Sequence, residues 1–273
     1  MRTELSQREI EDYQEKGFVV VEDFLTGEEL ERWREVVDGA VAARKDLKLS
    51  NREGDSRNWR AGDSYYDQVF VQRINLWQDN EAMRQLMFDS RLGKMAADLA
   101  GVDGVRIWHD QALIKQPWAN PTAWHLDNPY WSFHSRDAIS IWVALDDATY
   151  QNGCLYFLPG THKLTTYDNV GIGQNMADIF KVYPQFASIE AIAAPMKAGS
   201  CSFHNALIVH GAGANMTPGY RRAMTCAYMP DGSAFNGKKN VLSDEQVAQL
   251  EIGDLLADDA QNPLIYQRTK GDS

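Results

Sequence analysis

Two histidines and one aspartate in this chain form a set that can bind a metal ion. His125 and Asp127 are two residues apart, and His210 follows much later in the sequence. Two imidazoles and one carboxylate are the ligand set that holds non-haem Fe(II) on one face and leaves the opposite positions open. Arg221, a short distance beyond His210, carries a planar guanidinium that can bind a carboxylate through paired hydrogen bonds. Together these residues predict an iron-dependent oxygenase with a carboxylate co-substrate.

The residues around the first two candidate ligands predict how both reach one ion. Side chains two positions apart in an extended segment point to the same side, so His125 and Asp127 can bind together while Leu126 faces away. The run that follows, residues 129–133, is rich in aromatic side chains and predicts an apolar wall beside the ion.

The second histidine is expected at the end of a strand. The apolar run 206–209 predicts a buried strand that ends at His210, and Gly211 and Gly213 are expected to break it. Arg221 opens the next apolar stretch, so a strand, a turn and a second strand would bring it near His210.

His204 is the nearest alternative to His210 as the third ligand. It ends the run 201–204, where alternation could place it in the core or beside the metal without binding it. The Gly-x-Gly-x-Asn sequence after His210 and the position of Arg221 favour His210.

Further motifs give the chain a family resemblance. Residues 141–147 (IWVALDD), 152–155 (NGCL) and 158–163 (LPGTHK) form a highly specific set, which His210 with Arg221 completes. On these motifs, and on residues 5–25, the chain resembles the phytanoyl-CoA dioxygenase superfamily of Fe(II)/2-oxoglutarate-dependent oxygenases, almost from end to end.

The resemblance implies a ligand set and a co-substrate site. By it, His125, Asp127 and His210 bind the iron. Arg221 binds the distal carboxylate of 2-oxoglutarate, and Trp142 lines the co-substrate site. It further implies that O2 is consumed, that succinate and CO2 are released, and that a substrate is hydroxylated.

Three positions refine the comparison. Leu126 stands where relatives often have glutamine, and Ala212 where some have a serine that helps to bind the co-substrate. Radical halogenases of the superfamily have glycine or alanine in place of the ligand carboxylate, so Asp127 argues against halogenation.

The elements that must position these residues are helices flanking a β core. Capping-box patterns beginning at Ser6 and Thr26 predict helices over residues 7–16 and 27–43, with a strand between them. Residues 81–100 predict helices that end at Gly101. Short apolar runs and turns from 105 to 230 predict a β-sandwich or jelly roll, and the resemblance specifies a double-stranded β-helix.

Composition is that of a folded domain with a substantial core. Of the 273 residues, 44% are hydrophobic, and no Pro/Gly/Ser-rich linker divides the chain. We therefore predict one domain over residues 1–273. It comprises a mostly helical part (1–104), a β core (105–230) and a C-terminal extension (231–273), with a short helix after Ser243.

Charge and cysteine content narrow the expected partners and compartment. The net charge of -11 argues against a nucleic-acid partner. Three cysteines, all in apolar runs, predict free buried thiols in a reducing compartment. With neither an apolar signal core nor a run long enough to span a bilayer, the expectation is a cytoplasmic protein without membrane contact. Nothing in the chain indicates an oligomeric state.

The expected substrate is a small organic molecule. No basic cluster suited to the phosphates of CoA is evident, so the acyl-CoA substrate of the family is not carried over. The loop 44–60 is either a solvated loop or an active-site lid. Five aromatic side chains could line the substrate cavity or simply pack in the core: Trp108, Trp118, Tyr130, Trp131 and Phe133.

Two other functions use the same residues. A metal-dependent hydrolase or isomerase on a cupin-like fold could use the triad with another metal, but Arg221 would then have no carboxylate partner. A catalytically silent, ligand-binding relative would not need all three ligands.

Overall fold

Two antiparallel sheets form the centre of the protein in the computed structural model, which describes residues 1–44, 65 and 68–269. The larger sheet has seven strands in the order β1-β8-β5-β10-β3-β11, with β2 also paired to β3, and the smaller has the order β4-β9-β6-β7. The larger sheet contains β1 (Phe18–Val21), β2 (Val71–Ile74), β3 (Gly104–Lys115), β5 (Ile139–Ala144), β8 (Cys201–Asn205), β10 (Arg221–Pro230) and β11 (Leu264–Gln267). The smaller contains β4 (Thr122–His125), β6 (Leu155–Phe157), β7 (Ile192–Ala194) and β9 (His210–Ala212). The predicted double-stranded β-helix is confirmed.

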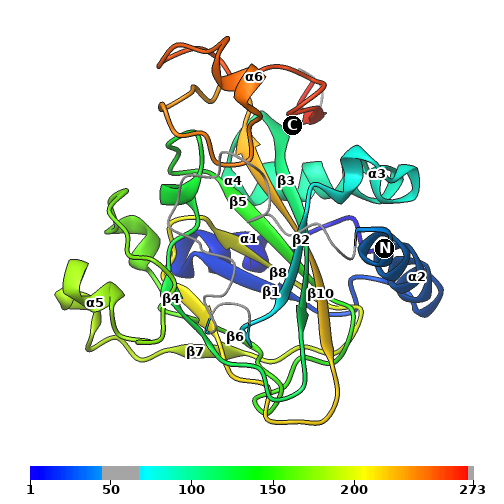
Figure 1. Ribbon diagram of the computed structural model, residues 1–273, viewed down its shortest axis with the longest axis vertical. Helices are drawn as coiled ribbons and strands as arrows, with labels where there is room; N and C mark the ends of the chain where they lie inside the picture. The colour runs from blue at the N-terminus through cyan, green and yellow to red at the C-terminus, as the bar shows by residue number, and fades with distance from the viewer. Residues whose placement is uncertain (45–64, 66–67, 270–273) are drawn as a thin grey trace.

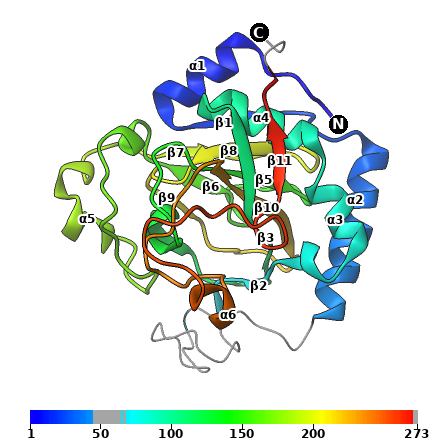
Figure 2. The ribbon, with the colours of Figure 1, turned by 90° about the horizontal axis from the view of Figure 1, so that it is seen from above.

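The helices lie around this core (Figure 1). They are α1 (Gln7–Lys16), α2 (Gly27–Ala43), α3 (Glu81–Met87), α4 (Ser90–Ala100), α5 (Ile179–Val182) and α6 (Asp244–Val247). Seen from above, α2 and α3 again lie on one side of the sheets and α5 on the other (Figure 2). Helices α1 to α4 therefore cover the larger sheet, while the α5 segment lies beside the smaller one.

The first helices begin where their capping boxes predict. The hydroxyl oxygen of Ser6 accepts from the backbone N–H of Glu9, whose carboxylate accepts from the backbone of Ser6, and Thr26 and Glu29 repeat the arrangement. The predicted ranges 7–16 and 27–43 are confirmed. Helix α4 ends at Gly101, whose φ of 70° is left-handed, as expected of a glycine after a helix.

Alternation along the larger sheet separates two cores. Ile141 and Val143 of β5 face the helices and pack with Trp33 of α2 and Met95 of α4. Trp142, between them in sequence, faces the other way, into the space between the sheets. The sheet therefore has an outer face that holds the helices and an inner face available for chemistry.

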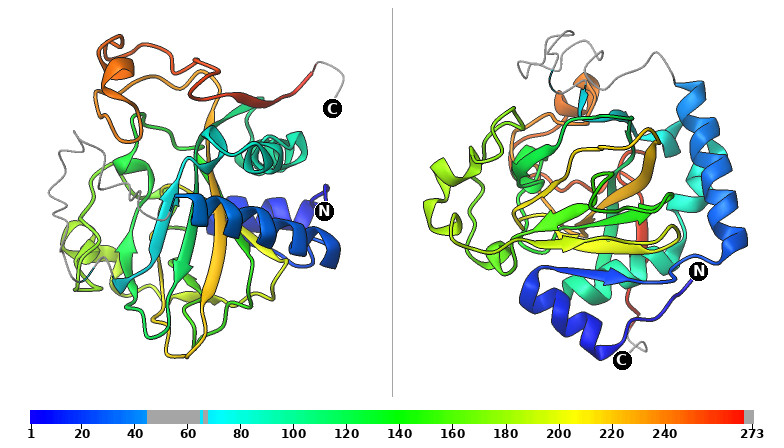
Figure 3. Two further views of the ribbon diagram at one scale, coloured as in Figure 1. Left: turned by 45° about the vertical axis from the view of Figure 1, so that its right-hand side comes forward. Right: turned by 90° about the horizontal axis from the view of Figure 1, so that it is seen from below.

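Three strands of the larger sheet come from outside residues 105–230. Strand β1 pairs with β8 at one edge, next to α1 (Figure 3). Strands β2 and β11 both pair with β3.

Among the described residues, none of the helices combines the length and apolar character needed to cross a bilayer. The loop proposed as a lid, residues 44–60, lies outside the described residues apart from Arg44.

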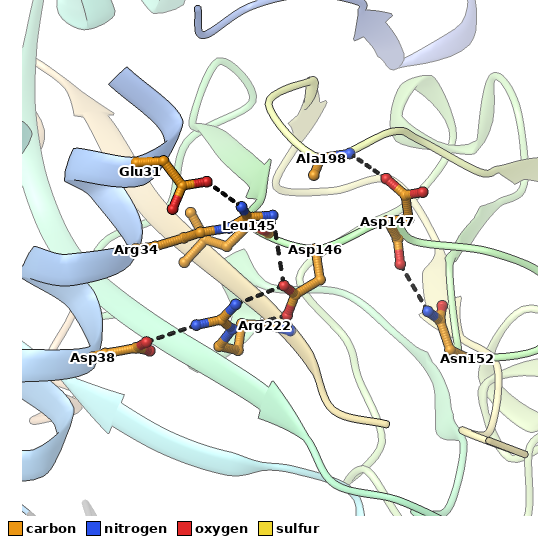
Figure 4. A network of polar contacts seen from close by, with 9 residues as sticks. All are labelled: Glu31, Arg34, Asp38, Leu145, Asp146, Asp147, Asn152, Ala198 and Arg222. Carbon is orange, nitrogen blue, oxygen red and sulfur yellow. Dashed lines mark hydrogen bonds and ion pairs between the residues drawn. The ribbon is translucent and has the colours of Figure 1, made fainter. Parts of the chain in front are cut away.

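The two aspartates of the IWVALDD motif have structural roles (Figure 4). Asp146 accepts hydrogen bonds from the guanidinium of Arg222 at 2.7 and 2.8 Å, and Arg222 also pairs with Asp38 of α2 at 2.6 Å. Asp147 accepts from the backbone N–H of Ala198 at 2.8 Å. This network ties α2 to the sheet and turns Arg222 away from the face that Arg221 occupies.

Two local predictions about the ligand segments are wrong. Residues 206–209 form a turn rather than a buried strand, and His210 begins β9 instead of ending a strand. The segment around Asp127 is also not continuously extended, because β4 stops at His125 and Asp127 has helical dihedrals (φ -82°, ψ -53°). Residues 206–209 are all buried, and burial alone does not distinguish a buried turn from a buried strand.

Candidate metal centre and co-substrate site

His125, Asp127 and His210 converge at one point between the sheets. One donor atom from each lies within 4.8 Å of the others. The Nε2 atoms of His125 and His210 are 3.6 and 3.8 Å from Oδ1 of Asp127. The two histidines lie directly opposite each other in the β4–β9 pairing, with ring centroids 4.2 Å apart. Strand pairing therefore brings together residues that are far apart in the sequence.

The turn at 206–209 positions the carboxylate. The carbonyl oxygen of Ala206 accepts from the backbone N–H of Asp127 at 3.1 Å and from that of Asn128 at 3.0 Å. Leu126 is fully buried and packs in a cluster with Leu158 and Val209. Gly211 continues β9 instead of breaking it. A Cβ there would lie 2.7 Å from the carbonyl oxygen of Thr122, so only glycine lets β9 approach β4 this closely.

Backbone hydrogen bonds fix the orientation of both imidazoles. Nδ1 of His125 lies 2.8 Å from the carbonyl oxygen of Ala123, and Nδ1 of His210 lies 3.1 Å from that of Ile208. Because a carbonyl oxygen can only accept, each Nδ1 carries the proton and each Nε2 presents a lone pair. This is the arrangement of histidines that bind a metal.

The electrostatics of the triad suit a cation. Burial alone would raise the pKa of Asp127, but the nearby imidazoles of His210, His125 and His204 hold it well below its usual range. Burial, with His125 and His204 beside it, lowers the pKa of His210 to about 3. An ionised carboxylate and neutral imidazoles are the states in which these groups bind metal.

Arg221 has unpaired hydrogen-bond donors on the inner face of the larger sheet, beside Trp142. Only 2% of the residue is exposed, and within the described residues its Nε and Nη1 atoms have no hydrogen-bond partner. Its Cζ lies 5.0 Å from the centre of the Trp142 ring, a cation–π distance. Burial lowers the pKa of Arg221 to about 10, so it remains charged at neutral pH. A buried guanidinium with free donors is a binding site for an anion.

Lys115 is a second cation here, and the sequence reasoning missed it. It is fully buried and pairs across the strands with Arg221. Its Nζ donates to the carbonyl oxygens of Asn120 at 2.6 Å and Val69 at 3.4 Å, and the described residues offer it no carboxylate. Burial, and secondarily Arg221, lowers its pKa to about 7. The sequence offered one signal, a lysine at the end of an apolar run. It does not reveal the register of β3 against β10, which places Lys115 beside Arg221.

Side chains in register form rows across the inner face of the larger sheet. One row contains His204, Ser140, Ala227 and His109 of β8, β5, β10 and β3. The next contains Ser202, Trp142, Thr225 and Gln111. His204, in the first row, lies 3.4 Å from Oδ2 of Asp127 through its Nε2 but is not one of the three converging donors. His210, and not His204, is therefore the histidine whose donor converges with those of His125 and Asp127.

The candidate wall residues divide between core and surface. Trp108, Trp131 and Phe133 pack together in one buried cluster, with Tyr130 partly buried against it. Trp118 is 69% exposed, so it is not packed in the core. It follows the last strand residue of β3 in a connection that runs over the surface, where an aromatic residue is not held inward.

Comparisons with known proteins agree with this geometry. The sequence profile of the phytanoyl-CoA dioxygenase family matches residues 13–223. The peroxisomal phytanoyl-CoA dioxygenase of Rattus norvegicus is 24% identical over 90% of this chain and 73% of its own length. A probable alpha-ketoglutarate-dependent hypophosphite dioxygenase of Stutzerimonas stutzeri is 24% identical over 80% of this chain and 76% of its own.

Solved structures share the fold. The non-heme alpha ketoglutarate dependent carbocyclase SnoK from nogalamycin biosynthesis superposes with a TM-score of 0.77 at 25% identity, covering 95% of this chain and 96% of that one. EctD from S. alaskensis, solved with 2-oxoglutarate and 5-hydroxyectoine, gives a TM-score of 0.67 at 20% identity over 85% and 78% of the two chains. The chain belongs to the phytanoyl-CoA dioxygenase family and is an Fe(II)/2-oxoglutarate-dependent oxygenase.

Proposed function

We propose that this protein hydroxylates a small organic molecule, with His125, Asp127 and His210 as the iron ligands. The observation that carries the proposal is the convergence of the two Nε2 lone pairs and the Asp127 carboxylate on one point. Two imidazoles and one carboxylate are the donor set of non-haem Fe(II) oxygenases, so the residues present fit this metal.

Arg221 supports 2-oxoglutarate as the co-substrate. Its unpaired buried donors fit the distal carboxylate, and Lys115 adds a second cation on the same face. Trp142 lies in the row between Arg221 and the row of His204, against the guanidinium. It would pack against the carbon chain of a co-substrate that extends from the metal to Arg221.

Iron with 2-oxoglutarate and O2 supplies the oxidising power, with succinate and CO2 as products. The protein supplies positions and charges. The carbonyl groups of Ala123 and Ile208 orient the two imidazoles, and the turn at Ala206 orients Asp127. Arg221 holds the far end of the co-substrate in a buried place where water does not compete for the carboxylate.

The inner face of the larger sheet favours a substrate with polar groups. Gln72 and Gln111 share this face and hydrogen-bond to each other at 2.6 Å, and both are only partly buried. Amides can donate hydrogen bonds to hydroxyl or carbonyl groups of a small molecule and accept them from its hydroxyl groups.

The three cysteines support a reducing compartment such as the cytoplasm, because all of them are buried free thiols: Cys154, Cys201 and Cys226.

An anaerobic titration of the metal-free protein with Fe(II) and 2-oxoglutarate tests the proposal. We expect a visible metal-to-ligand charge-transfer band that is absent from His210→Ala, and succinate formation once O2 is admitted. Tight binding of other divalent metals with no such band would favour a hydrolase or isomerase. The absence of any metal binding would favour a silent relative.

A further inference from the structure

The two oxygens of the Asp127 carboxylate face different groups. Oδ1 lies 3.6 Å from Nε2 of His125 and 3.8 Å from Nε2 of His210, on the side where the candidate metal ligands converge. Oδ2 lies 3.4 Å from Nε2 of His204. The carboxylate therefore has one oxygen toward the metal position and the other toward a third histidine.

His204 is held rigidly in this place. It lies inside β8, with Phe18 of β1 and Ser140 of β5 as its cross-strand neighbours. Its ring packs against Phe157 at 5.6 Å and against His210 at 4.7 Å between centroids. Only 3% of the residue is exposed. An imidazole fixed by two strands and two rings cannot swing away to another partner.

In the described part of the chain, Asp127 is also the only ion-pair or hydrogen-bond partner of the His204 imidazole. Its Nδ1 is buried and has no hydrogen-bond partner. Asp127, for its part, receives no backbone N–H hydrogen bond at its carboxylate among the described residues. A buried imidazole with one ion-pair partner depends on that partner for its hydrogen bond, because an unpaired buried donor is costly.

We propose that His204 is a positioning residue that donates its Nε2–H to Oδ2 of Asp127, so that the carboxylate binds the metal through Oδ1 alone. The proposal rests on the proposed function, in which Asp127 is an iron ligand.

The physical reason lies in the number of coordination positions. An octahedral ion has six coordination positions. Two oxygens of 2-oxoglutarate and one of O2 would take three of them, so each of the three protein ligands can bind through only one atom. A carboxylate without an outer partner can rotate and bind through both oxygens, which closes a position that O2 requires. A donor on Oδ2 prevents that rotation and keeps the carboxylate oriented for binding.

Metal affinity measured without turnover tests this role. Calorimetric titration with Mn(II) would compare the parent protein with His204→Leu, which has no donor, and His204→Gln, whose amide N–H can still reach Oδ2. We expect His204→Leu to bind Mn(II) about 10- to 100-fold more weakly and His204→Gln to recover most of that loss. His109→Leu, a buried histidine of the same row that is not within ion-pair distance of Asp127, should keep the parental affinity.

The possible results distinguish a failure of the His204 role from a failure of the proposed function. Parental affinity in a folded His204→Leu would overturn the positioning role, as would equal losses in the leucine and glutamine variants. A loss in His204→Gln as large as that in Asp127→Ala would make His204 a ligand and overturn the proposal as well. If the parent binds no divalent metal, the proposed function itself fails. Thermal unfolding of each variant establishes that it is folded.

Discussion

Arg221 and Lys115 are direct cross-strand partners, the first residue of β10 against the last of β3. Both side chains are buried on the inner face, and the described residues supply neither with a carboxylate. Two buried cations side by side are unfavourable until an anion joins them. The pair therefore gives the site a strong electrostatic preference for a carboxylate ligand.

Replacing Arg221 should mainly weaken co-substrate binding. Loss of a charge-assisted hydrogen-bond pair in a buried place is worth about 1.5–3 kcal/mol, or roughly 10- to 100-fold in Kd. We expect Arg221→Ala to show this loss for 2-oxoglutarate in the anaerobic charge-transfer titration while Fe(II) affinity is retained. An unchanged Kd for 2-oxoglutarate would contradict the role of Arg221.

Arg222 offers the matched control. It is the next residue, carries the same charge and faces Asp146 and Asp38 on the outer side. Arg222→Ala should lower the melting temperature, because it leaves the partly buried Asp146 without its main partner. Its Kd for 2-oxoglutarate should match that of the parent protein.

Binding of 2-oxoglutarate should take up a proton through Lys115. Burial and Arg221 lower the pKa of the free Lys115 to about 7, and a carboxylate placed beside it raises that pKa again. The groups that face its ammonium are Arg221 and the carbonyl oxygens of Asn120 and Val69. Between the two pKa values the complex holds more protons than the free protein, so affinity falls as pH rises above about 7, by up to about tenfold per pH unit.

Calorimetry of the iron-loaded protein at pH 8, in buffers with different ionisation enthalpies, measures this proton directly. Lys115→Met should remove the buffer dependence and weaken 2-oxoglutarate binding. Heat that is independent of buffer in the parent protein would show that Lys115 does not respond to the co-substrate.

The same pKa shift predicts how stability depends on pH without ligand. The unfolded chain keeps an ordinary lysine, so between about 7 and the usual pKa of about 10.4 it binds more protons than the folded protein. Through this group, stability should therefore rise with pH across that window. Chemical denaturation at pH 7 and pH 9 should show a smaller pH dependence in Lys115→Met than in the parent.

Asp127→Ala should abolish turnover. The change removes the only charged ligand of the triad, so metal binding should weaken strongly and succinate should not form. Inductively coupled plasma analysis of bound iron and a succinate assay measure the two effects. Retained turnover in this variant would show that another residue completes the metal site.

Gly153 should tolerate no side chain. Its φ is 91°, and a Cβ would lie 2.5 Å from the carbonyl oxygen of Gly213 and 2.7 Å from Cδ of Lys115. Gly153→Ala should lower the free energy of unfolding by about 1–3 kcal/mol and displace the side chain of Lys115. As a control, Gly39→Ala, in exposed space within α2, should raise it by about 0.5–1 kcal/mol. Denaturant titrations of both variants measure these changes.

Local signals were sufficient for the helices and for the choice of candidate metal ligands. The capping boxes at Ser6 and Thr26 fix where α1 and α2 begin, because the interacting groups are only three residues apart. The metal donors could also be chosen from residue type and motif. They converge in the structure as expected, although two of the local conformations that carry them were mispredicted.

Pairing between distant segments decided the rest. Residues 206–209 are as apolar as a strand, but the backbone of Ala206 is used to hold Asp127, which makes the segment a turn. Lys115 and His204 acquire their neighbours Arg221 and Asp127 only through register and through the facing of the two sheets. The sequence alone determined which groups could do the chemistry. Tertiary structure alone decided which of them meet, because strand register depends on contacts between residues far apart in the chain.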